Sequence, residues 1–177
     1  MTTISQTEHT TEDITAVIIQ SIFQNCEIIR NKQVPNSNIK TRPDFYIPSE
    51  QLIIEFDGYQ HYNTSSVILR DRLKDVRYGE MGIKIIRIPY FVQLTRSVQQ
   101  ILFNDVSSTH VVYPHGFINN KALLPADFCE LGIKRFVQDL NDYEFIAEEI
   151  ILSLVNKINT ASCIEEVLPP SLFYLAA

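Results

Sequence analysis

The sequence predicts an α/β fold in which helices flank a mixed β-sheet. The first observation is the order of its patterns: a segment with helical periodicity, three short β-type runs, a second helical segment, and an apolar run that ends at Pro89. The second is composition. At 177 residues, with 45% hydrophobic and 20% charged residues, the chain suits one domain with a core of its own. A mainly helical C-terminal extension is predicted to follow.

The first predicted helix covers residues 11–24, because isoleucine and valine recur there at helical spacing. Thr10 or Thr11 is the predicted N-cap, and Asp13 completes a capping box with Thr10. Glu12 lies in the first turn, where a carboxylate interacts favourably with the helix dipole.

A short strand is predicted within Cys26–Arg30, and the polar segment 31–42 that follows is predicted to be a loop. This loop carries Lys40 and Arg42 near its end. The two basic side chains either are simply solvated or lie along a phosphate backbone.

A β-hairpin is predicted next. Two extended runs, Phe45–Ile47 and Leu52–Phe56, are separated by the turn residues 48–50. Centring the hairpin on this turn places Asp44 across from Glu55.

The second hairpin strand presents an electrostatic conflict. Strand periodicity places Glu55 and Asp57 on one face of a run that is otherwise apolar enough to be a central strand. Carboxylates opposite one another destabilise a sheet, and unpaired buried carboxylates are costly. A hard divalent cation such as Mg²⁺ resolves the conflict, and a protonated pair is the alternative. Taken singly, Asp44 could merely open a strand, and Asp57 could merely belong to a turn with Gly58.

A second helix is predicted over residues 67–81. Its apolar side consists of Leu69, Leu73 and Val76. A basic stripe on another side consists of Arg70, Lys74 and Arg77. The stripe either contacts phosphate or is an exposed face with i,i+4 ion pairs.

The chain continues with a predicted buried strand at residues 83–88 and a helix at residues 92–103. Within residues 105–177, one helix is predicted from Pro125 to about residue 140, with Gly132 as a weak point.

A last helix, ending near Asn159, is apolar over much of its circumference, and the tail at residues 167–175 is also apolar. These segments are expected to pack on the core, or to form the interface of a homodimer.

Charge and cysteine content bound the class of protein. The net charge is −6, but residues 1–104 hold 11 basic and 11 acidic residues, whereas residues 105–177 hold 4 basic and 10 acidic ones. Several of the acidic residues in the first part are the candidate metal ligands, and without them this part is locally basic, as phosphate contact requires. Three widely spaced cysteines make a zinc site or a disulfide framework unexpected. No apolar run suits a membrane span and no signal peptide is evident, so a cytoplasmic location is expected.

One motif carries a resemblance to a known family. Pro43-Asp44, ten residues, Glu55-Phe56-Asp57-Gly58, and then Gln60-His61 resemble the metal site of PD-(D/E)XK nucleases, and especially the branch related to very-short-patch-repair (Vsr-like) endonucleases. The resemblance covers about residues 10–100 and implies a restriction-endonuclease-like core within residues 1–104. The usual third motif residue is Lys, and Asp57 occupies that position here.

The resemblance implies a metal-dependent endonuclease that hydrolyses DNA phosphodiester bonds. Mg²⁺, or Mn²⁺ in its place, would be held by Asp44, Glu55 and the carbonyl of Phe56. The expected catalytic residues are Asp44, Glu55, Asp57, His61, Lys74 and Glu12. The ion would lower the pKa of a bound water, His61 with Asp57 or Glu12 would handle the proton, and Lys74 would stabilise charge on the phosphate.

The expected nucleic-acid contacts are Lys40, Arg42, Gln60, Arg70 and Arg77. Two alternatives remain from the sequence: a non-catalytic nucleic-acid-binding module that keeps the nuclease fold, and a ribonuclease.

Overall fold

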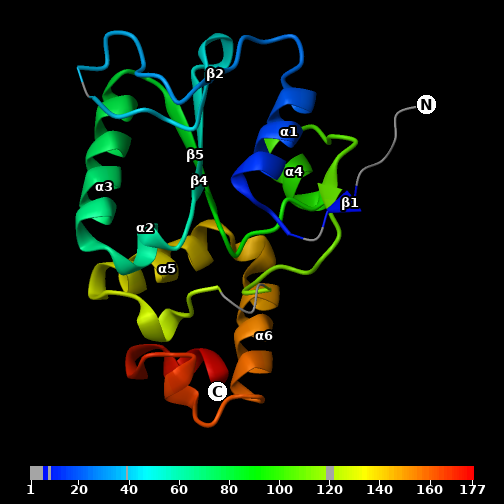
Figure 1. Ribbon diagram of the computed structural model, residues 1–177, viewed down its shortest axis with the longest axis vertical. Helices are drawn as coiled ribbons and strands as arrows, with labels where there is room; N and C mark the ends of the chain where they lie inside the picture. Colours follow the sequence, from blue (N-terminus) through cyan, green and yellow to red (C-terminus); the bar gives the residue numbers. More distant parts are fainter. Residues whose placement is uncertain (1–5, 8, 39, 119–121) are drawn as a thin grey trace. The chain divides into compact units, whose positions relative to one another are not determined.

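The computed structural model describes residues 6–7, 9–38, 40–118 and 122–177 as an α/β protein (Figure 1). The chain forms two compact units. The first unit consists of Met1–Asp57, Leu69–Ile88 and Leu94–Tyr113. The second consists of Gly58–Ile68, Pro89–Gln93 and Pro114–Ala177.

A four-stranded mixed sheet is the centre of the first unit. Its order is β2 (Ile29–Arg30), β3 (Phe45–Ile47), β4 (Leu52–Asp57) and β5 (Lys84–Pro89). The first three strands pair antiparallel. The Lys84 N–H donates to the Gln51 carbonyl at 2.8 Å, where β4 and β5 both begin, so these two strands run parallel.

The predicted hairpin is confirmed. A 3₁₀ turn (Pro48–Glu50) connects β3 to β4, and Gln51 closes it in the left-handed region with φ 46°. Phe45 pairs with Ile54, and both are buried.

Helices cover both faces of this sheet (Figure 1). Helices α1 (Glu12–Ile22) and α4 (Arg96–Phe103) lie on one face, and α3 (Ser65–Glu80) lies on the other. The Thr11 side chain accepts a hydrogen bond from the Ile14 N–H at 3.2 Å, which confirms one of the two predicted N-caps. A separate parallel pair joins β1 (Gln6–Thr7) to β6 (His110–Val111).

Helix α3 does not bury the side that the sequence pattern favours. Its exposed residues include Leu69, Leu73 and Val76, whose side chains are 54%, 54% and 58% exposed. Its buried residues include Asp71, Lys74 and Tyr78. The apolar side identified from the sequence is therefore not the packed side, because the sheet face beneath the helix carries carboxylates that require polar and cationic neighbours. The stripe of Arg70, Lys74 and Arg77 is divided for the same reason, since only Lys74 of the three is buried.

The second unit is mainly helical. It contains α2 (Gln60–Asn63), the start of α3, α5 (Glu130–Asp142) and α6 (Ala147–Ile158). The 3₁₀ segments among its described residues are Pro125–Asp127, Glu144–Ile146, Ile164–Glu166 and Pro170–Ala176. The apolar tail packs within this unit, where Leu168 and Leu172 are buried. None of the described helices is long and apolar enough to cross a membrane.

The predicted start of the first C-terminal helix was wrong. The segment at Pro125 forms a separate 3₁₀ turn, and the following α-helix begins at Glu130. Gly132 is buried in that helix, and a Cβ added to it would lie 1.7 Å from the carbonyl oxygen of Tyr62. The glycine therefore permits a close main-chain approach.

Candidate metal centre

The β3–β4 hairpin brings Asp44 and Glu55 together. Phe45 pairs with Ile54, so continuing the register by one residue places Asp44 opposite Glu55, as expected. The Phe56 N–H donates to Asp44 Oδ2 at 2.8 Å, which holds the Asp44 carboxylate against the end of β4. Two carboxylates and one main chain therefore meet at this edge of the hairpin.

Asp44 is the carboxylate of this group whose ionised form is disfavoured. Burial, followed by the negative charge of Glu55, raises its pKa from 3.8 to about 6, although the hydrogen bond from Phe56 opposes the shift. Glu12 and Asp57 add smaller contributions in the same direction. No ion pair of Asp44 is present among the residues that the structure describes. A cation bound at this position would therefore relieve unfavourable electrostatic energy.

Glu12 makes a small contribution to the raised pKa of Asp44, and its expected catalytic role stays a prediction. It is exposed at the start of α1, where its carboxylate lies 3.6 Å from the Arg30 guanidinium. An exposed ion pair of this length contributes little stability, so Glu12 can be reoriented at low cost.

Glu55 has a cationic partner from α3. Lys74 Nζ donates to Glu55 Oε1 at 2.8 Å, and the side chains are only 10% and 5% exposed respectively. Because both side chains are buried, removing either one would leave the other as an uncompensated buried charge. This contact places Lys74, a predicted catalytic residue, directly beside a predicted metal ligand.

Asp57 is fully buried and pairs with Arg87 of β5 at 3.0 Å. The same guanidinium donates to Asp75 of α3 at 2.7 Å and lies 3.9 Å from Asp71. Burial alone would lower the pKa of Arg87, but Asp57 and the other carboxylates raise it above its usual value. The role of Arg87 was missed in the sequence, where it was one residue of an apolar strand. A charged residue within such a run was the available signal.

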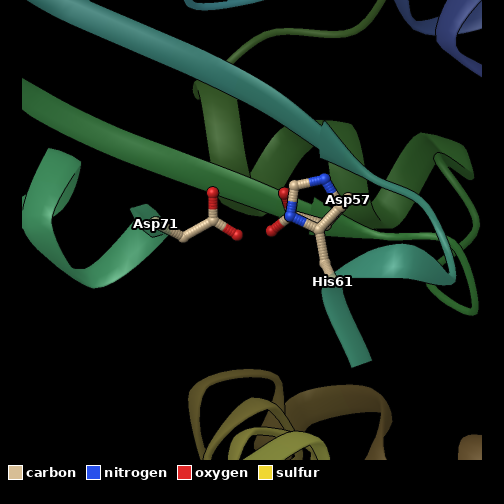
Figure 2. A group of neighbouring side chains, drawn as sticks. All are labelled: Asp57, His61 and Asp71. Atoms are coloured by element: carbon tan, nitrogen blue, oxygen red, sulfur yellow. The ribbon is translucent and has the colours of Figure 1, made fainter. Parts of the chain in front are cut away.

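The carboxylates of Asp57 and Asp71 also lie close to each other. Carboxylate oxygens of the two residues lie within 4.8 Å of each other, and Figure 2 shows the carboxylates, from β4 and α3, turned toward one another. Figure 2 also draws His61, which is on α2 in the second unit. His61 follows Asp57 by four residues, so the chain limits their Cα separation to about 14 Å.

The residues expected to contact nucleic acid are all exposed: Lys40, Arg42, Gln60, Arg70 and Arg77. Arg77 also pairs with Glu80 at 3.1 Å on the surface of α3. Exposure is necessary for such contacts but is equally typical of solvated side chains, so these roles stay predictions.

In comparisons with known proteins, no family model, no curated protein and no solved structure matches this chain.

Proposed function

We propose that the chain is a metal-dependent endonuclease of the PD-(D/E)XK class that hydrolyses DNA phosphodiester bonds. The observation that carries this proposal is Asp44, a partly exposed carboxylate held opposite buried Glu55 with its pKa raised to about 6. Such perturbed carboxylates concentrate at functional sites. The mixed sheet between α1 and α3 is compatible with a restriction-endonuclease-like core.

The ligands fit a hard divalent cation. Carboxylate oxygens of Asp44 and Glu55, with the main-chain carbonyl of Phe56, would hold Mg²⁺ or Mn²⁺. When bound, the ion supplies Lewis acidity that lowers the pKa of water and polarises the scissile phosphate. The charge of the ion also removes the repulsion between the two carboxylates.

The protein's own residues would prepare this chemistry. The Phe56 N–H orients Asp44, and Lys74 donates to Glu55. Lys74 would also stabilise negative charge on a phosphate. In the reaction, a water oxygen bonds to phosphorus as the ester P–O bond breaks, and the water proton is transferred toward the leaving oxygen. His61 would accept or donate this proton, assisted by Glu12.

Asp57 would have a structural role. Because it is fully buried and paired with Arg87, its main role would be to fix the end of β4 from which the chain continues to His61. The Asp57–Arg87 pair would therefore hold the conformation of this segment.

Cleavage of supercoiled plasmid tests the proposal. The protein should nick or linearise plasmid with Mg²⁺ or Mn²⁺, and EDTA or Asp44→Asn should abolish cleavage, whereas Glu50→Gln, an exposed carboxylate in the turn of the same hairpin, should not. A matched RNA substrate distinguishes a ribonuclease. Metal-independent binding of DNA without cleavage of either nucleic acid would favour the binding module and refute the enzyme.

A further inference from the structure

In the second unit, the short helix α2 carries His61. Several contacts from α5 fix this helix. Helix α2 lies beside α5 (Figure 1). The buried Tyr62 hydroxyl donates to Asp139 Oδ2 at 2.6 Å. Arg135 NH1 donates to the carbonyl oxygen of His61 at 3.4 Å, and the Arg135 guanidinium lies 5.2 Å from the centre of the Tyr62 ring. Side chains of α5 thus contact both His61 and Tyr62.

The main chains of the two helices also approach closely. The Cys129 N–H, at the N-terminal end of α5, donates to the Tyr62 carbonyl at 3.1 Å. A Cβ at position 132 would lie 1.7 Å from the same carbonyl oxygen, so glycine is required for this approach. This packing fixes the distance between α5 and the α2 main chain.

Tyr62 is also held by the aromatic core of the second unit. Its ring stacks on Phe128 with 5.1 Å between centroids and meets the edge of Tyr90 at 5.7 Å. Phe91 packs on it at 5.5 Å. The residue after His61 is therefore locked by a buried hydrogen bond, a main-chain contact and aromatic packing, which together leave the His61 backbone little freedom.

We propose that α5 is a positioning element for His61, with Asp139 and Arg135 as positioning residues. The proposal rests on the proposed function, because it assigns the C-terminal helices a task in the same reaction. Asp139 fixes the Tyr62 side chain, and Arg135 fixes the carbonyl of His61 itself. Neither residue needs to touch the substrate, yet displacing the His61 backbone would remove the imidazole from its working position.

The test separates rate from binding. Tyr62→Phe removes the hydroxyl and keeps the ring, Asp139→Ala removes the acceptor, and Asp139→Asn keeps an acceptor oxygen. For the first two we expect DNA cleavage at saturating substrate to fall about 10- to 100-fold, the size of effect expected from misplacement of a catalytic group. DNA affinity should not change, and Asp139→Asn should recover most of the rate. Lys134→Met, which removes an exposed ion pair on the same helix, is the matched control and should keep the wild-type rate.

Imidazole resonances give a readout that does not require cleavage. The His61 signals, assigned from the spectrum of His61→Gln, should shift in Tyr62→Phe and Asp139→Ala but not in Lys134→Met. An active wild type whose two variants retain full rate would overturn the positioning role. If the wild type cleaves neither DNA nor RNA with any metal, the proposed function fails. In that case shifted His61 signals still support positioning by α5, and unshifted signals reject it.

Discussion

Replacing Asp44 with Asn should make the metal-free protein more stable while it abolishes metal binding. Asn has nearly the same shape and keeps an oxygen for the Phe56 N–H, but it carries no charge. The pKa of Asp44 is raised from 3.8 to about 6, mainly by burial and then by Glu55. At 1.36 kcal/mol per pKa unit, ionised Asp44 destabilises the native state by at most about 3 kcal/mol.

The effect depends on pH in a defined direction. Between about pH 4 and pH 6 the native state keeps the Asp44 proton that the unfolded chain has lost, so this carboxyl group lowers stability as the pH rises through that window. Asp44→Asn lacks the penalty. The variant should match the wild type near pH 4 and exceed its unfolding free energy by about 2–3 kcal/mol at pH 7.5. For a chain of this length the Tm should rise by roughly 5–10 °C.

Thermal unfolding in EDTA, measured at intervals from pH 4 to pH 7.5, checks both the size and the direction. Adding Mg²⁺ at ten times its Kd should stabilise the wild type by about 1.4 kcal/mol and leave Asp44→Asn unchanged. Glu50→Gln, on the exposed turn of the same hairpin, should resemble the wild type in every condition. Equal stability of wild type and Asp44→Asn at pH 7.5, or equal stabilisation by Mg²⁺, would refute the reasoning.

Three further substitutions test the charged layer between α3 and the sheet by urea unfolding at pH 7.5. Lys74→Met should cost about 3–5 kcal/mol, because it leaves Glu55 buried without its cation, whereas Lys84→Met at an exposed site should change stability by less than about 0.5 kcal/mol. Arg87→Met should also cost about 3–5 kcal/mol, and a change below 1 kcal/mol would mean that its ion pairs are not needed. The unfolding free energy of Leu73→Gln should stay within about 0.5 kcal/mol of the wild-type value. A larger loss of stability would show that the apolar side of α3 is packed.

The hairpin and its opposed carboxylates could be predicted from sequence because both depend on short-range rules. Strand periodicity and the turn at Pro48 fix which residues face each other, so Asp44 and Glu55 follow directly. The N-cap at Thr11 is equally local.

The packing of α3 could not be predicted in the same way. Helical periodicity identified the side with Leu69 and Leu73, but which side is buried depends on the sheet face that the helix meets. That face carries Glu55 and Asp57, and it selects Lys74 from α3 and Arg87 from β5. The parallel pairing of β1 with β6 joins residues about a hundred positions apart, and two-residue strands give no periodic signal.

The partners of Asp44, Glu55 and Asp57 differ, and the difference indicates where a metal would matter most. Glu55 has Lys74 and Asp57 has Arg87, so the fold itself supplies a cation for each fully buried charge. Asp44 has a main-chain N–H and a raised pKa instead. A sheet selected for stability alone would gain by losing that carboxylate, since its removal eliminates the repulsion with Glu55. The residue that costs the fold energy is therefore the one whose retention a bound divalent cation best explains.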